Sequence, residues 1–154
     1  MGAPEIPGET SGARGLDELR VLVVDDHDLF RIGLRNLLEE QGVNVVGEAE
    51  SGEAAIRLAP DLAPDVVIMD LNMPGAGGVE TTRRLATLAP LSRVVVLTIS
   101  ADDDDVMSAV MAGACGYLLK DASIQELMQG LEAAAVVALP ISVAIEGLVT
   151  VPPS

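Results

Sequence analysis

Three carboxylates, a hydroxyl and an ammonium each follow closely on a short aliphatic run of the sequence. The carboxylates belong to Asp25, Asp26 and Asp70, the hydroxyl to Thr98 and the ammonium to Lys120. Carboxylates packed together repel one another, so such a cluster is tolerable when a divalent cation binds it. Oxygen ligands that leave room for water and a phosphate suit Mg²⁺ better than zinc. Because aspartate also forms covalent phospho-intermediates, these residue types together suit phosphoryl transfer to an aspartate.

These side chains can act together only if the fold brings them to one place. Helix-like segments separate five aliphatic runs that we expect to be strands: Val21–Val24, Val43–Val46, Val66–Met69, Val94–Leu97 and Tyr117–Leu119. Strands that alternate with helices predict an α/β fold, a doubly wound five-stranded parallel sheet with helices on both faces. In such sheets ligands bind at the carboxyl ends of the strands. We therefore expect the polar side chains to gather at that edge.

The predicted helix boundaries rest on capping residues. We expect Asp28 to cap the first helix, which Gly42 ends, and Ser51 to cap a second helix that ends near Pro60. The segment Ser123–Glu126 has the capping-box pattern of a last helix. Phe30, Leu34, Leu37 and Leu38 are expected to fall on one face of the first helix, and a helix with Val79, Leu85 and Leu88 is expected after the glycine-rich loop at residues 75–78.

Composition limits the classes of function. The 154 residues are enough for one domain, whose core must be aliphatic because the chain has one Phe, one Tyr and no Trp. A net charge of -15 disfavours nucleic acid and anionic membrane as partners. The single cysteine and the absence of an apolar leader or spanning segment favour a cytoplasmic protein.

Four motifs, in consistent order and spacing, resemble the signature of the receiver domain of bacterial two-component response regulators: Val23–Asp26, Met69–Gly75, Leu97–Thr98 and Gly116–Lys120. Two longer stretches, Asp25–Leu34 and Gly116–Asp121, are similar to the subfamily whose output domain is a LuxR-type helix-turn-helix, the NarL/FixJ-like regulators. The resemblance covers roughly residues 19–135 and implies the strand order 2-1-3-4-5.

The resemblance assigns the central role to Asp70, which would accept a phosphoryl group from a phosphohistidine on a sensor histidine kinase. It implies that Asp25 and Asp26 bind Mg²⁺ together with Asp70 and the backbone carbonyl of Asn72. The domain would catalyse only its own phosphorylation and would not be an enzyme that turns over other substrates.

The remaining roles implied by the resemblance concern the response to phosphorylation. Thr98 would hydrogen-bond a phosphoryl oxygen, Lys120 would pair with the phosphate, and Tyr117 would turn inward as an aromatic switch. The change would control transcription or a partner protein, and regulators of this class often form homodimers when phosphorylated.

We expect three segments along the chain. Residues 1–18 are predicted to be a disordered tail, 19–139 the receiver domain, and 140–154 an apolar tail or linker remnant. No Lys or Arg follows Lys120, so we expect no direct DNA binding by this chain and expect the output domain of the subfamily to be absent from it. Our hypothesis for the apolar tail is that it packs on the domain or on a second copy.

The sequence leaves two other functions open. An aspartyl-phosphate phosphatase of the haloacid-dehalogenase type has an Asp-x-Asp pattern after its first strand, which Asp26–Asp28 fits weakly. A phosphorylation-independent pseudo-receiver would have lost an acidic or lysine position, and none is lost here.

We expect His27 to be a polar residue leading into the first helix rather than a base or ligand, and Cys115 to be a small buried hydrophobe. Asp102–Asp105 is expected to complement a helix N-terminus rather than to bind a second metal.

Overall fold

The chain forms one five-stranded parallel sheet with five helices, seen in a computed structural model that describes residues 18–75, 77–100 and 104–136. The strand order is β2-β1-β3-β4-β5, as the resemblance implied, and the α/β prediction is confirmed. The elements in chain order are β1 (Arg20–Val24), α1 (Asp28–Glu40), β2 (Asn44–Ala49), α2 (Gly52–Leu62), β3 (Val66–Asp70), α3 (Gly78–Leu88), β4 (Arg93–Thr98), α4 (Asp104–Ala112), β5 (Gly116–Leu119) and α5 (Ile124–Ala135).

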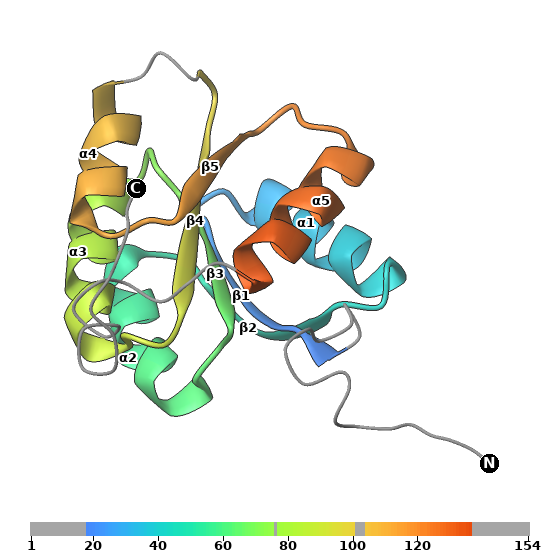
Figure 1. Cartoon of the computed structure of the whole chain (residues 1–154), viewed down its shortest axis with the longest axis horizontal. Coiled ribbons are helices and arrows are strands. Elements are labelled where there is room, and N and C mark those ends of the chain that lie inside the picture. Colours follow the sequence, from blue (N-terminus) through green and yellow to red (C-terminus); the bar gives the residue numbers. More distant parts are fainter. Residues whose placement is uncertain (1–17, 76, 101–103, 137–154) are drawn as a thin grey trace.

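The three central strands are apolar on both sides because helices cover both faces of the sheet. Helices α1 and α5 lie on one face and α2, α3 and α4 on the other (Figure 1). Along β3, Val66 and Ile68 pack with α1 and α5, whereas Val67 and Met69 belong to the opposite core. This alternation follows from the twofold periodicity of a strand, so a continuous aliphatic run serves two cores at once.

The predicted capping residues are partly correct. The Ser51 hydroxyl accepts the Ala54 amide at 3.0 Å, and Ser123 forms the expected capping box with Glu126. The prediction for Asp28 is wrong: His27 is the N-cap of α1, without a side-chain cap, and Asp28 is the first helical residue. Helix α1 does end before Gly42, whose φ of 90° is a positive value that glycine adopts readily and other residues rarely do.

Helix α2 contains Pro60 and ends two residues beyond it, at Leu62, so the prediction that it ends near Pro60 is confirmed. Other expectations are corrected. Leu37 is exposed although its predicted helix face also carries the buried Leu34 and Leu38, because apolar residues at helical spacing can lie at the border of the buried stripe. Cys115 is exposed rather than buried, because it lies at the end of the turn that leads into β5.

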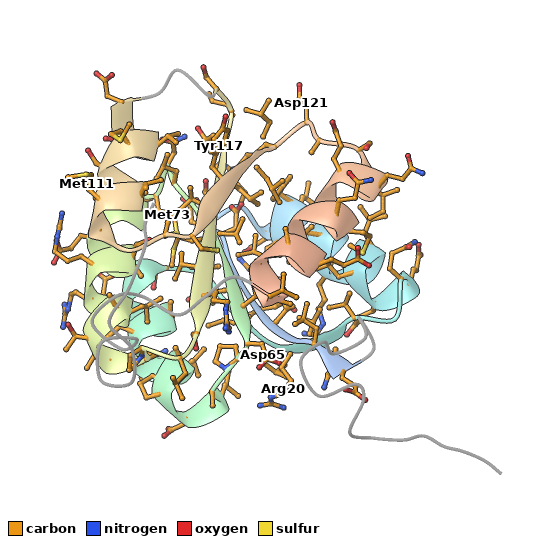
Figure 2. The ribbon with its side chains drawn as sticks, in the orientation of Figure 1. Arg20, Asp65, Met73, Met111, Tyr117 and Asp121 are labelled. Carbon is orange, nitrogen blue, oxygen red and sulfur yellow. The ribbon has the colours of Figure 1, made fainter. Side chains whose placement is uncertain are left out.

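The two edges of the sheet carry different contacts. At the amino edge, the Arg20 amide donates to Asp65 at 2.9 Å, and these two residues lie far from Asp121 at the carboxyl edge (Figure 2).

The predictions for residues 1–17 and for 140–154 concern residues outside those described, so the proposed segment boundaries stay predictions. None of the helices in the described ranges is long and apolar enough to cross a membrane.

The loop after β3 runs very close to the start of α3. A Cβ added to Gly78 would lie 2.6 Å from the carbonyl oxygen of Asp70 and 2.7 Å from the Cα of Leu71. Both atoms belong to the backbone, which cannot move aside as a flexible side chain would. Gly78 therefore allows α3 to begin directly against the end of β3, where Asp70 stands.

Candidate functional site

Asp25 follows the last residue of β1 and is held by the neighbouring strand. Its amide donates to the carbonyl of Ala49 at 3.0 Å, which extends the pairing with β2 by one residue. Its side chain is fully buried, and its Oδ1 accepts the amide of His27 at 2.8 Å. The carboxylate is thus fixed at the carboxyl edge of the sheet, as predicted.

Asp70 is the last residue of β3 and is also fully buried. Its Oδ1 accepts the amide of Asn72 at 3.2 Å and lies 3.0 Å from the Nζ of Lys120. Its Oδ2 is buried and has no hydrogen-bond partner among the described residues. One oxygen of Asp70 is therefore engaged and the other is available to a ligand.

Lys120 follows β5 and reaches into the space between the two buried aspartates. Its Nζ lies 3.0 Å from Asp70 and 3.4 Å from Asp25, and its side chain is 17% exposed. The ammonium also lies 4.9 Å from the centre of the Phe30 ring, within range of a cation–π interaction. Its backbone amide donates to the carbonyl of Thr98 at 2.8 Å, which ties the end of β5 to β4.

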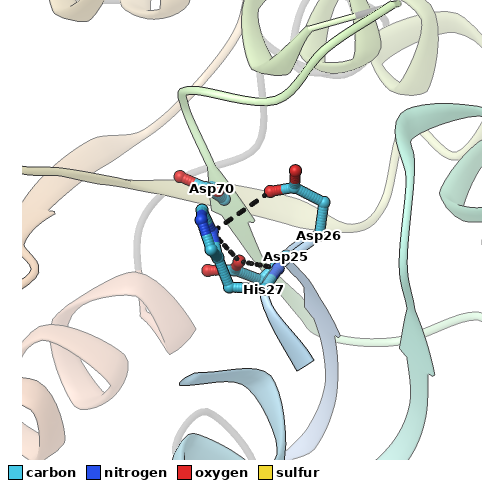
Figure 3. A group of neighbouring side chains, drawn as sticks. All are labelled: Asp25, Asp26, His27 and Asp70. Carbon is cyan, nitrogen blue, oxygen red and sulfur yellow. Dashed lines mark hydrogen bonds and ion pairs between the residues drawn. The ribbon is translucent and has the colours of Figure 1, made fainter. Parts of the chain in front are cut away.

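The acidic cluster can hold a divalent cation. One ligand atom from each of Asp25, Asp26, His27 and Asp70 lies within 4.8 Å of the others (Figure 3). Within the described chain, Asp25 Oδ2, Asp26 Oδ1 and Asp70 Oδ2 are buried without a hydrogen bond. Buried carboxylate oxygens left without hydrogen bonds are costly, so the donor set fits a hard cation that prefers oxygen ligands.

The pKa of the Asp70 carboxyl is set by its burial and by the charged and polar groups around it. Burial raises the pKa of this carboxyl above its ordinary value, and the nearby charge of Asp25 acts in the same direction. The Lys120 ammonium and the Asn72 amide oppose that rise in pKa. The net increase means that the folded protein holds the negative charge of Asp70 at a cost, which a cation bound at the cluster would relieve.

Thr98 ends β4 at this edge and Tyr117 lies opposite Val96 in the sheet, and neither touches the carboxylates in any described contact. Thr98 is fully buried, and its hydroxyl donates to the carbonyl of Ser100 at 3.1 Å and accepts the Ser100 amide at 3.3 Å. Tyr117, on β5, is 45% exposed. Asn72 is placed by its amide contact to Asp70. The predicted carboxylates, Thr98 and Lys120 therefore share the carboxyl edge of the sheet, with Asp25 and Asp70 in direct contact with the lysine, whereas Tyr117 pairs with Val96 within the sheet.

Sequence reasoning gave no role to Arg31, which lies beneath the loop between β1 and α1. Its Nη1 donates to the carbonyl of Asp25 at 2.8 Å, its Nε to Glu48 at 2.9 Å, and its Nη2 to Asp28 at 2.8 Å. The spacing of Asp28 and Arg31 on a helix was a visible signal for one of these pairs. The contact to β2 could not be foreseen because it depends on the packing of α1.

The comparison with protein families decides the identity. The family described as "Response regulator receiver domain" matches residues 21–132. The chain belongs to this family.

Relatives of this receiver domain are transcription and response regulators. It is 46% identical over 114 residues to the response regulator GacA of Pseudomonas aeruginosa, covering 73% of this chain and 53% of that protein. It is 42% identical over 116 residues to the nitrate/nitrite response regulator protein NarL of Escherichia coli, covering 75% and 54%. The chain thus spans about half the length of the curated relatives it matches, and the predicted likeness to NarL-type regulators is confirmed.

Solved structures agree with the fold of the receiver domain. The signal receiver domain of the putative response regulator NarL from Mycobacterium tuberculosis superposes with a TM-score of 0.70 at 37% identity, covering 76% of this chain and 95% of that one. The response regulator domain of Thermotoga maritima CheB gives a TM-score of 0.72 at 30% identity, covering 78% and 98%. The phosphatase alternative is not favoured, because the matching family model, relatives and solved structures are those of response regulators.

Proposed function

We propose that this receiver domain accepts a phosphoryl group on Asp70 from a phosphohistidine of a sensor histidine kinase. The observation that carries the proposal is the contact pattern of the Asp70 carboxylate: Oδ1 lies beside the Lys120 ammonium, and Oδ2 is buried with no hydrogen bond from any residue that the structure describes. A carboxylate oxygen that is positioned and desolvated in this way suits nucleophilic attack on phosphorus.

The proposed phosphoryl transfer needs only the Asp70 carboxylate and the phosphohistidine donor as reacting groups. An Asp70 oxygen forms a bond to phosphorus, and the phosphorus–nitrogen bond of the donor breaks, with its electron pair and then a proton going to the leaving imidazole. Lys120 is already within 3.0 Å of Asp70 and would pair with the transferred phosphoryl group. Thr98 would exchange its contact to the Ser100 carbonyl for a phosphoryl oxygen. The domain would catalyse this transfer to itself and no turnover of other phosphoesters.

Asp25, Asp26 and Asp70, with the backbone carbonyl of Asn72, are the residues we assign to a Mg²⁺ ion. The buried carboxylate oxygens without hydrogen bonds support this assignment. Bound Mg²⁺ would supply positive charge that neutralises the phosphoryl oxygens during transfer. The residues of the chain fix where that charge stands, because the Asp25 carboxylate is anchored to the His27 amide.

The output of the domain would be a change in the surface formed by β4, α4 and β5. Movement of Thr98 toward the phosphoryl group would vacate space beside β5, and Tyr117, now 45% exposed, would turn inward. We assign residues 19–139 to this switching domain. Its partners would be the kinase, a second copy of the phosphorylated domain, and an output domain or protein that controls transcription in the cytoplasm.

Mass spectrometry after incubation with acetyl phosphate and Mg²⁺ tests the proposal. The wild-type chain is expected to gain the mass of one phosphoryl group, and Asp70→Asn is expected to gain none. Asp121→Asn is the matched control, because Asp121 is an exposed aspartate one residue beyond Lys120. Equal modification of Asp70→Asn and the wild type, or no modification of the wild type, would refute the assignment.

A further inference from the structure

The imidazole of His27 lies within the acidic cluster, although the sequence favoured a role outside it. Its Nδ1 is 3.4 Å from Asp25 Oδ1 and 3.4 Å from Asp26 Oδ1 (Figure 3). It is also part of the group whose ligand atoms lie within 4.8 Å of one another, together with Asp70. The cluster therefore offers a nitrogen donor beside its oxygen donors.

These separations suit ligands that share one ion. With metal–ligand bonds of about 2.1 Å, two ligands on one ion stand roughly 3.0 Å apart at an octahedral angle and roughly 3.4 Å apart at a tetrahedral angle. The distances from His27 Nδ1 to Asp25 and Asp26 are at the upper end of that range. The Asp26 Oδ1 atom is itself buried without a hydrogen bond.

The backbone of His27 is fixed while its ring is free to adjust. His27 is the N-cap of α1, and its amide donates to Asp25 at 2.8 Å, so its Cα keeps a set distance from the cluster. Its side chain is 70% exposed, so packing among the described residues constrains small rotations of the ring only weakly. The ring can close on an ion without disturbing the core.

We propose that His27 is a further ligand of the cation site and raises its affinity for divalent transition metals such as Co²⁺ relative to Mg²⁺. The inference rests on the cation site proposed above and adds its metal selectivity. Imidazole suits the later first-row dications, whereas Mg²⁺ keeps oxygen ligands and water. Removal of the imidazole should therefore weaken Co²⁺ binding and leave Mg²⁺ binding almost unchanged.

An ion pair between a protonated imidazole and the two carboxylates would give the same distances, so the test must detect coordination itself. His27 is the only histidine of the sequence. In a tag-free chain, any imidazole proton signal shifted by direct bonding to paramagnetic Co²⁺ must therefore come from this residue. Nuclear magnetic resonance of the full chain with Co²⁺ provides that readout without any measurement of phosphorylation.

The experiment compares the wild type, His27→Ala, His27→Gln and Asp26→Asn by this resonance measurement and by calorimetric titration with Co²⁺ and with Mg²⁺. We expect shifted imidazole signals in the wild type and their loss in both His27 variants. Co²⁺ affinity should fall by about tenfold or more in these variants, the range seen when a group that supports a metal ligand is lost. Mg²⁺ affinity should change by less than about twofold.

Three results would overturn the inference: no shifted imidazole signal, an equal loss of Co²⁺ and Mg²⁺ affinity in His27→Ala, or shifted signals that persist at the same Co²⁺ concentration in Asp26→Asn. The last result would place Co²⁺ on His27 apart from the cluster. The same experiment shows separately whether the proposed cation site is wrong. If it is wrong, Asp26→Asn should bind Mg²⁺ as tightly as the wild type does.

Discussion

Replacement of Arg31 by Met should loosen the loop that carries the acidic pair. The Arg31 side chain is only 11% exposed, and its Nη1 donates to the carbonyl of Asp25 at 2.8 Å. Met has a similar length and no donor, so this buried carbonyl would lose its partner, at about 1–3 kcal/mol. The fold should remain, because the apolar part of the side chain is retained.

The loss of the other two contacts of Arg31 adds little to this loss of stability. Asp28 is largely exposed, and an exposed ion pair contributes about 0–1 kcal/mol. Glu48 keeps a second partner, since Arg35 Nη1 lies 2.6 Å from its Oε2. We therefore expect Arg31→Met to lower the free energy of unfolding by about 2 kcal/mol, most of it from the orphaned carbonyl.

Urea unfolding followed by circular dichroism measures this loss, and Arg35→Met is its matched control. Arg35 binds the same Glu48 but is 36% exposed and has no described contact with the loop, so its loss should lower the free energy of unfolding by less than about 1 kcal/mol. Mg²⁺ affinity, measured by calorimetry, should fall by about tenfold in Arg31→Met only. Equal effects of the two substitutions on stability and on Mg²⁺ affinity would refute the idea that Arg31 positions the loop.

Other substitutions test the site from different sides. Because the pKa of Asp70 is raised by burial, its ionised form destabilises the fold above that pKa, so Asp70→Asn should unfold at higher urea than the wild type at neutral pH. Gly78→Ala should lose about 1–3 kcal/mol of stability, since its Cβ would meet the backbone of Asp70, whereas Gly33→Ala, with open space around it, should gain about 0.5–1 kcal/mol. Hydrogen bonds from Arg35 and Arg31 lower the pKa of Glu48, so its contribution to stability is present above its unfolded pKa and is lost as pH falls through its folded pKa. The decline in urea midpoint on acidification should be shallower in Glu48→Gln.

The sheet and its acidic edge were predictable because they depend on short-range patterns. Runs such as Val66–Met69 are apolar at every position, which marks a strand covered on both faces, and a polar residue directly after such a run must lie at the carboxyl edge. The capping box at Ser123 is likewise a local signal. These features require no knowledge of how the helices pack.

The features that were missed depend on packing and on side-chain direction. The reach of Arg31 from α1 to Glu48 on β2 is set by how the helix lies on the sheet. The exposure of Leu37 depends on a small rotation of the same helix about its axis. From the sequence His27 is an ordinary polar residue leading into the first helix, and its approach to Asp26 appears only in three dimensions.

Reductive trapping of the phosphorylated chain tests the central claim most directly. Borohydride cleaves an aspartyl phosphate and converts the side chain to an alcohol, so peptide sequencing then identifies the residue that carried the phosphoryl group. We predict that position 70 alone is converted to homoserine after treatment with a phosphorylated histidine kinase and Mg²⁺. Conversion at Asp25 or Asp26, or equal conversion in the absence of a phosphoryl donor, would contradict the account.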